Sequence, residues 1–179
     1  LWVMPESLAR AGFDAAGWLA ARMRSRGMRQ LELNLARVLE LPQQHPLVRT
    51  QATRAMRAYM RYYCETFLLP RWSTQRVRDS VRVVNSGPVL AALRNGGVIL
   101  TLPHSGNWDL AGAWAADQLG SLCTVAERLR PEGVFRKFLG MRRAIGITLM
   151  PLSGEPGVYE FLRDCVATGR VVALLGDRD

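Results

Sequence analysis

From residue 81 onward, short runs of consecutive apolar residues alternate with stretches whose apolar residues recur at the helical period, and glycine or proline separates them. Each run is apolar throughout, which is typical of parallel strands covered by helices on both faces. We expect five strands, at 81–84, 98–102, 122–126, 148–152 and 171–175, and helices at 88–94, 108–118, 131–145 and 157–167. The sequence therefore predicts an α/β fold, with a mostly parallel β-sheet flanked by helices.

The first part of the chain lacks this alternation and is expected to be helical. Its longest segment, 47–67, is amphipathic at 100° per residue, with one arc of about 100° formed by Val48, Ala52, Ala55, Met56, Tyr59 and Tyr63. We expect this arc to be buried and the opposite side, with Arg54, Arg57 and Arg61, to form a cationic face. Weaker helical patterns cover 5–23 and the region around 31–38. We therefore expect a basic, amphipathic helical region at 1–70 and an α/β core at 71–179.

The net charge is uneven along the chain. The whole sequence has 24 basic and 15 acidic residues, which gives +9. Residues 1–82 contain 14 arginines and 6 acidic residues, and therefore carry +8 of this total. Such a surface attracts polyanions, which include nucleic acid, anionic lipid headgroups and phosphorylated substrates. Composition leaves these three partner classes open, including the alternative of a basic nucleic-acid-binding protein that is not an enzyme.

Several classes of site and segment lack their usual sequence markers. The chain contains no G-x-G-x-x-G, P-loop or H-E-x-x-H pattern, which are typical of dinucleotide, nucleoside triphosphate and zinc peptidase sites. An odd number of cysteines without a C-x-x-C pair indicates neither a disulfide framework nor a zinc site. No run of about 18 uncharged apolar residues is present. The chain starts without methionine and stops directly after the run 171–175, so we expect it to be a fragment.

The loops after the predicted strands are the places to search for chemistry, because open α/β sheets bind ligands beyond the carboxyl ends of their strands. The loop after Leu102 contains His104 and Asp109, which are too far apart around a continuous helix, at about 140°, to meet. A turn at Gly106, followed by an N-cap at Asn107, would let Asp109 fold back toward His104. A carboxylate on one imidazole nitrogen raises the basicity of the other, as a general base for a hydroxyl requires. The alternative is that His104 only caps or packs the strand end.

The other polar residues in these loops are weaker candidates. Ser105 lies outside any G-x-S-x-G elbow, so its hydroxyl is expected to line the turn rather than act as a nucleophile. Glu127 could bind sugar hydroxyls or form an ion pair with Arg128 or Arg130, and Asp177 has the same two readings. Arg128 could hold phosphate or carboxylate with its forked donors, or be an ordinary surface arginine. These alternatives remain open at this point.

Four segments carry a resemblance to a known family. Residues 102–112 resemble the H-x-x-x-x-D/E signature of the bacterial lipid A biosynthesis acyltransferases, whose fold is glycerolipid acyltransferase-like. Residues 34–38, 124–132 and 174–179 are similar to the actinobacterial phosphatidylinositol mannoside acyltransferases within it. The resemblance extends over nearly the whole chain. One departure is Asp177, where the mannoside branch is expected to have glutamate and the lipid A branch aspartate.

The resemblance implies an acyltransferase that moves a palmitoyl-like group from acyl-CoA to a mannose hydroxyl of phosphatidylinositol mannoside. In it, His104 would be the general base and Asp109 its orienting, charge-balancing partner, without an acyl-enzyme. The expected substrate-binding residues are Ser105, Asn107, Glu127, Arg128 and Asp177. No metal or cofactor is expected beyond acyl-CoA as co-substrate. The alternative is a lipid A type late acyltransferase that uses an acyl-carrier protein as donor.

The resemblance also gives the basic helical region at 1–70 a role. It implies a peripheral protein on the cytoplasmic face of the inner membrane, drawn to an anionic membrane surface and facing it with amphipathic helices. The alternative is that these helices simply pack on the sheet. The expected partners are then acyl-CoA, a glycolipid acceptor and the membrane surface, with no nucleic acid.

Overall fold

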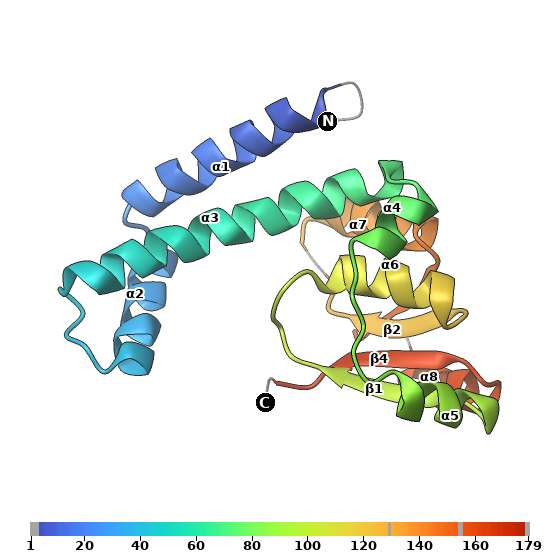
Figure 1. Ribbon diagram of the computed structural model, residues 1–179. Coiled ribbons are helices and arrows are strands. Elements are labelled where there is room, and N and C mark those ends of the chain that lie inside the picture. Colours follow the sequence, from blue (N-terminus) through green and yellow to red (C-terminus); the bar gives the residue numbers. More distant parts are fainter. Residues whose placement is uncertain (1–3, 129, 154–155, 178–179) are drawn as a thin grey trace. The chain divides into compact units, whose positions relative to one another are not determined.

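The computed structural model describes residues 4–128, 130–153 and 156–177, shown in Figure 1. The chain divides into two compact units, Leu1–Leu68 and Leu69–Asp179. Within the described part of the chain, no helix combines the length and the apolar character needed to cross a membrane.

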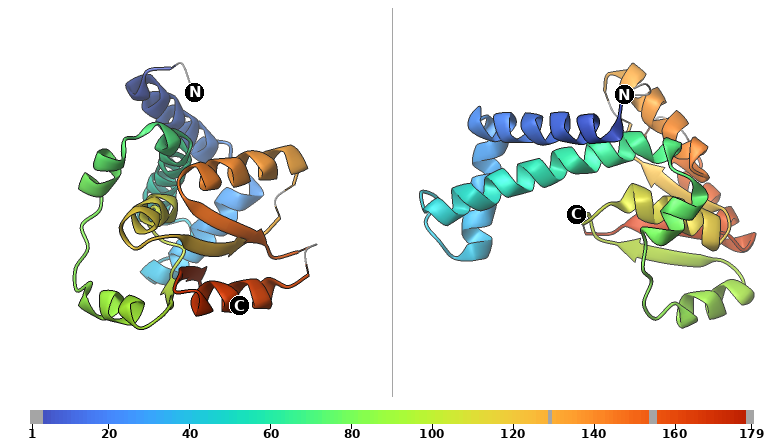
Figure 2. Two further views of the ribbon diagram at one scale, coloured as in Figure 1. Left: turned by 90° about the vertical axis from the view of Figure 1, so that its right-hand side faces the viewer. Right: turned by 45° about the horizontal axis from the view of Figure 1, so that its top comes forward.

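The first unit consists of three helices, α1 (Glu6–Arg22), α2 (Arg26–Leu39) and α3 (Pro46–Leu68), as the sequence predicted. The helices α1 and α3 run antiparallel and lie side by side in Figures 1 and 2. Gly17 permits this close approach, because a Cβ atom there would lie 2.9 Å from the Cα atom of Arg57. Arg57 then donates two hydrogen bonds to Asp14, of 2.8 and 2.7 Å. This pair joins the two helices at their surface.

The apolar arc of α3 is buried over only part of its length. Val48 and Ala52 are fully buried, whereas Tyr59 is 50% exposed and its hydroxyl lies 2.9 Å from that of Tyr63. The prediction that Tyr59 belongs to the buried face is therefore wrong. A tyrosine tolerates this position because its hydroxyl remains hydrated or hydrogen-bonded while its ring packs on a neighbour, here edge-on against Tyr63.

The second unit is an α/β structure. Its elements in chain order are a 3₁₀ turn (Leu69–Arg71), α4 (Thr74–Asp79), α5 (Gly87–Arg94), β1 (Val98–Leu102), α6 (Trp108–Gln118), β2 (Leu122–Ala126), α7 (Glu132–Ala144), β3 (Ile147–Pro151), α8 (Val158–Ala167) and β4 (Val171–Leu175). The four strands form one sheet in the order β1-β4-β2-β3, and every neighbouring pair is parallel. The predicted fold class, a parallel sheet flanked by helices, is confirmed.

The predicted first strand, 81–84, is absent from this sheet. These residues lie in the segment between α4 and α5, where Val83 is 45% and Val84 70% exposed. An apolar run becomes a strand only when a neighbouring strand and a covering layer are available for it. Arg82 interrupts the run, and the described residues supply neither of these to it. The remaining four predicted strands are present, and β3 begins one residue earlier than expected.

Helices cover both faces of the sheet. On one face α6 packs through Ala115 against Leu122 and Val171, and on the other α8 packs through Cys165 against Cys123 and Val172. Neighbouring residues of β2 and β4 therefore point into opposite cores, which explains why these two runs have no polar face. In β1, by contrast, Ile99 and Thr101 remain exposed. The carboxyl ends of all four strands meet at one edge of the sheet, and the loops that follow β1, β2, β3 and β4 gather there.

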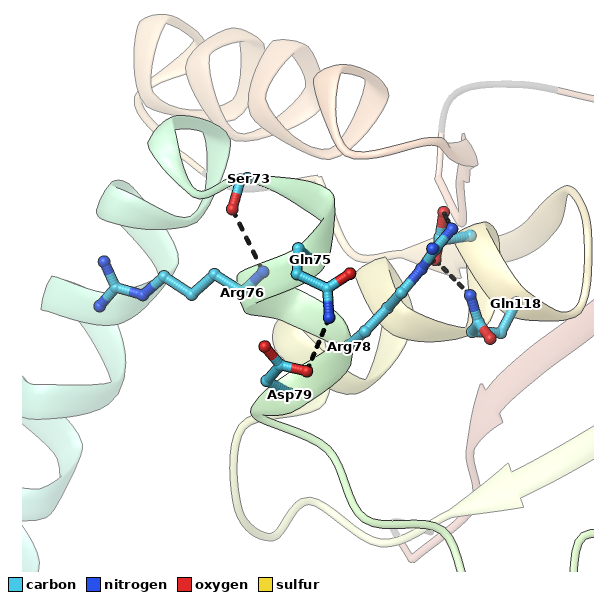
Figure 3. Close-up of polar contacts among 7 residues, drawn as sticks. Ser73, Gln75, Arg76, Arg78, Asp79 and Gln118 are labelled. Atoms are coloured by element: carbon cyan, nitrogen blue, oxygen red, sulfur yellow. Dashed lines mark hydrogen bonds and ion pairs between the residues drawn. The ribbon is translucent and has the colours of Figure 1, made fainter.

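The helix α4 is tied to the C-terminal end of α6, at the opposite end from the loop that precedes α6 (Figure 3). Arg78 donates from Nε and Nη2 to both carboxylate oxygens of Asp117, at 2.7 and 3.1 Å. Gln118 donates to the same carboxylate at 2.6 Å. Beneath this contact, Val77 of α4 packs on Ala113 of α6. These contacts hold α6 in place from its far end.

Candidate active site

The two residues that dominate the strand-end edge are His104, two positions after β1, and Asp177, two positions after β4. Because β1 pairs with β4 in a register that sets Leu102 opposite Leu175, these two residues are brought side by side. One oxygen of Asp177, Oδ1, lies 2.5 Å from Nδ1 of His104, and the other, Oδ2, accepts the backbone N–H of His104 at 2.8 Å. Both carboxylate oxygens are therefore engaged by one residue.

This contact determines which imidazole nitrogen carries the proton. An ionised carboxylate can only accept hydrogen bonds, so Nδ1 of His104 is the donor and Nε2 of the neutral ring keeps its lone pair. The ring of Trp108 meets that of His104 edge-on, with 5.7 Å between the ring centroids. The side chain of His104 retains 28% exposure. The imidazole is thus oriented from two sides and remains accessible to a ligand.

The hydrogen bonds from His104, first from its backbone N–H and then from its ring, hold the pKa of the Asp177 carboxyl below its ordinary value of 3.8. Asp177 is therefore ionised at neutral pH. A carboxyl group whose pKa is lower in the folded than in the unfolded state stabilises the fold above its ordinary pKa, and this contribution is lost as the pH falls through its folded pKa.

We predict a pH-dependent difference in stability between the wild type and Asp177→Asn. The wild type should be the more stable protein above pH 4, and its advantage should shrink as the pH falls below 3.8 toward the folded pKa of Asp177. Urea unfolding of both proteins measures the difference over the range from about pH 2.5 to about pH 7, which brackets this titration. A difference that stays constant with pH, or grows toward acid, would contradict the assignment.

Asp109 has another partner than the one predicted. It lies in the first turn of α6, is only 2% exposed, and its Oδ1 accepts a 2.8 Å hydrogen bond from Nε of Arg142 in α7. The sequence predicted Asp109 as the carboxylate that fixes the His104 tautomer, but the carboxylate on Nδ1 is that of Asp177. The side chain of Asp109 is enclosed at the α6–α7 contact, and a buried carboxylate requires a cation there.

The turn between β1 and α6 has the expected local structure. Gly106 has a positive φ of 67°, and the side chain of Asn107 caps α6 by accepting the N–H of Leu110 at 3.0 Å. Ser105 is exposed on this turn. The side-chain oxygen of Asn107 is therefore used in the helix cap. Ser105, the residue after His104, is instead exposed to solvent.

The loop after β2 adds charged residues to the same edge. Glu127 is exposed, and Arg128 forms a two-point ion pair with Glu132, with Nε–Oε2 and Nη2–Oε1 distances of 3.0 and 3.2 Å. The sequence indicated Glu127 as a possible ion-pair partner of Arg128, and the structure shows Arg128 paired with Glu132, which was not predicted from the sequence. In the described part of the chain, no three histidine, cysteine or acidic side chains gather where they could hold a metal ion.

Comparison with known proteins assigns this chain to a family. A family model described as bacterial lipid A biosynthesis acyltransferase matches residues 1–179. The chain belongs to the bacterial lipid A biosynthesis acyltransferase family. It is 38% identical over 181 residues to a phosphatidylinositol mannoside acyltransferase of Mycolicibacterium smegmatis, covering 98% of this chain and 58% of that protein. It is 39% identical over 183 residues to a phosphatidylinositol mannoside acyltransferase of Mycobacterium tuberculosis, covering 98% and 56%. The chain therefore spans somewhat more than half the length of these relatives.

For this member of the lipid A biosynthesis acyltransferase family, no role for Arg142 was predicted from the sequence. Asp177 was also not identified as the partner of His104. A signal for Arg142 existed, because an acidic residue that becomes buried needs a nearby cation, and Arg142 lies in the last turn of the predicted helix 131–145. A signal for Asp177 also existed, because it follows a predicted strand by the same two residues as His104 does. What the sequence lacked was the order of the strands.

Proposed function

We propose that the protein transfers a fatty acyl group from acyl-CoA to a mannose hydroxyl of a phosphatidylinositol mannoside. The observation that carries the proposal is the His104–Asp177 pair, which leaves an accessible imidazole nitrogen free to take a proton. Its position at the strand-end edge is where open α/β sheets bind substrates. Membership of the family and the names of the two relatives support the reaction class and the acceptor.

The reaction follows from the two imidazole nitrogens. Nε2 of His104 accepts the proton of the mannose hydroxyl as its oxygen bonds to the thioester carbonyl carbon. The resulting tetrahedral intermediate expels the coenzyme thiolate as the C–S bond breaks, and Nε2 returns the proton to sulfur. Asp177 keeps the proton on Nδ1 and stabilises the imidazolium while it exists. The products are the acylated glycolipid and free coenzyme thiol, so no acyl-enzyme is needed.

The surrounding residues support this step in two different ways. Asp109 and Arg142 anchor the first turn of α6, so that the turn carrying His104 is held in position. The same turn places the positively polarised end of α6, an eleven-residue helix, next to the reaction, where it favours a developing oxyanion. Glu127 and Ser105, both exposed at the strand-end edge, are suited to hydrogen-bond sugar hydroxyls.

We propose that the first unit attaches the protein peripherally to an anionic membrane surface, on the cytoplasmic side where acyl-CoA is found. Trp18, Leu19 and Met23 are apolar residues that are 40%, 55% and 78% exposed on or just after α1. The guanidinium of Arg22 stacks on the Trp18 ring, 3.5 Å from its centroid. Exposed apolar side chains beside arginines suit a surface of lipid tails and anionic headgroups.

The test of the proposed reaction is release of thiol from palmitoyl-CoA by the full-length protein. We expect release to depend on added phosphatidylinositol mannoside and to yield an acylated mannolipid detectable by mass spectrometry. Parallel reactions contain palmitoyl acyl-carrier protein as donor or a lipid A precursor as acceptor. Equal release with and without acceptor would indicate a thioesterase instead. Transfer only from the carrier protein to the lipid A precursor would replace the proposed substrates by those of the lipid A branch.

A further inference from the structure

A hollow of about 860 Å³ lies beyond the ends of β2 and β3, and we call it the arginine hollow. It is lined by Arg128, Arg130, Pro131, Glu132 and Ser153. Arg128 follows the end of β2 by two residues, and Ser153 follows the end of β3 by two residues. Because Ala126 and Pro151 are opposite each other in the β2–β3 register, the two strand ends support the two sides of the hollow.

The described residues that line the arginine hollow carry an excess of positive charge. Among the described residues that line the hollow, Glu132 carries the one carboxylate, and its ion pair with Arg128 neutralises that carboxylate and lowers its pKa. The side chain of Arg130 is exposed, and it forms no hydrogen bond or ion pair with residues 4–128, 130–153 or 156–177. The guanidinium of Arg128 is therefore held in place by Glu132, while no acidic side chain in the described part of the chain pairs with that of Arg130.

This combination suits a phosphate ester. A guanidinium presents two parallel N–H donors that match two phosphate oxygens, and such charge-assisted pairs are stronger than neutral hydrogen bonds. The hydroxyl of Ser153, on the other side of the hollow, is able to donate to a third oxygen. An apolar ligand would gain little here, because it would leave the unpaired guanidinium of Arg130 unsatisfied.

The position of the hollow relates it to the candidate active site. In the order β1-β4-β2-β3, the ends of β2 and β3 are two and three strands away from the end of β1, which carries His104. At the usual spacing of parallel strands this is roughly 10–15 Å. Both proposed substrates place a phosphate at some distance from their reacting atom: the donor in its coenzyme moiety, and the acceptor in its phosphodiester.

We infer that the arginine hollow binds a phosphate ester group of one of the two substrates, with Arg130 as its principal contact. The inference rests on the proposed function, because that function supplies the two possible sources of the phosphate. Arg130 is then a substrate-binding residue that determines affinity, and it takes no part in the proton transfer at His104.

The test measures whether the loss of affinity caused by removing the Arg130 side chain depends on the presence of the ligand's phosphate. Calorimetric titrations compare full-length wild type and Arg130→Gln in two arms. The donor arm uses coenzyme A and pantetheine, which lacks its phosphates. The acceptor arm uses glycerophosphoinositol mannoside and the corresponding mannosyl inositol without phosphate. In one arm, we expect Arg130→Gln to weaken binding of the phosphorylated ligand about 5- to 20-fold and to leave its phosphate-free analogue unchanged.

Two further variants sharpen this comparison. Arg94→Gln removes the same charge from an exposed arginine in the last turn of α5, at the amino end of β1, and should leave every affinity unchanged. Glu132→Gln releases Arg128 from its ion pair and should tighten binding of the phosphorylated ligand. The effect of Arg130→Gln should also diminish in high salt, because the contact is between exposed charges.

The outcomes separate this inference from the proposed function. A loss confined to the donor arm assigns the hollow to the coenzyme phosphates, and a loss confined to the acceptor arm assigns it to the phosphodiester. Equal affinities of wild type and Arg130→Gln in both arms, or an equal loss in Arg94→Gln, would overturn the inference. Binding is measured without turnover, so the two tests are independent. If Arg130→Gln weakens binding of the phosphorylated ligand as expected but no acyl transfer is found, only the proposed reaction is contradicted.

Discussion

His104→Ala is expected to reduce acceptor-dependent release of thiol from palmitoyl-CoA on the order of 10²- to 10⁴-fold, the usual contribution of a positioned general base. The variant loses the nitrogen that takes the hydroxyl proton, but it keeps the backbone N–H that donates to Asp177. The loop should therefore remain in place. The expected signature is a fall in kcat for the full-length protein with little change in the affinity for coenzyme A.

The matched control is the other histidine, His45, which precedes α3 and accepts the N–H of Leu47 through Nδ1 at 3.2 Å. His45→Ala should leave kcat unchanged. The readouts are initial rates of thiol release over a range of acceptor concentrations, and circular dichroism to verify folding. A folded His104→Ala protein that retains a tenth or more of the wild-type kcat would remove His104 as the base.

Arg142→Met is expected to lower the free energy of unfolding by about 3–5 kcal/mol, because it leaves a buried carboxylate without its cation. Asp109 is 2% exposed and Arg142 is 18% exposed, so water cannot readily replace the lost partner. Equilibrium unfolding in urea measures the change. Activity should fall along with stability, since the first turn of α6 would lose its anchor on α7.

The neighbouring residue provides the control for this prediction. Arg143 is exposed in the same helical turn, so Arg143→Met should change the unfolding free energy by less than about 0.5 kcal/mol. Combining Arg142→Met with Asp109→Asn removes both charges, and we expect the double variant to recover part of the loss. A loss below about 1 kcal/mol for Arg142→Met, typical of surface pairs, would show that the pair is not a structural anchor.

The location of His104 could be predicted because all of its determinants are local. The apolar run 98–102 defines the strand, Gly106 supplies the turn with its positive φ, and Asn107 caps the following helix. The partner of His104 depends instead on which strands are neighbours, and Asp177 is 73 residues away in the chain. Asp109 was the nearest carboxylate in sequence, and sequence proximity favoured it over the correct one.

The same distinction explains the other differences. Arg142 lies 33 residues after Asp109 in the chain and meets it only because α7 lies beside α6, which no local pattern specifies. Residues 81–84 have apolar side chains that suit a strand, but strand formation depends on a neighbouring partner. Tyr59 lies on the apolar arc of α3, yet the extent of burial along that arc depends on how far α1 covers it. Local signals thus identify elements and turns, while partners across elements depend on tertiary packing.

The strand order also constrains when the candidate site can form during synthesis. Of the four strands described, β4 comes latest in the chain; it lies between β1 and β2, and it is the only described strand with which β1 pairs. A nascent chain that has not yet reached β4 therefore holds β1 without a hydrogen-bonded neighbour, and His104 without its carboxylate. Closing this sheet requires contacts between residues far apart in the chain, which fold slowly. The His104–Asp177 pair can therefore form only after β4 has been added between β1 and β2.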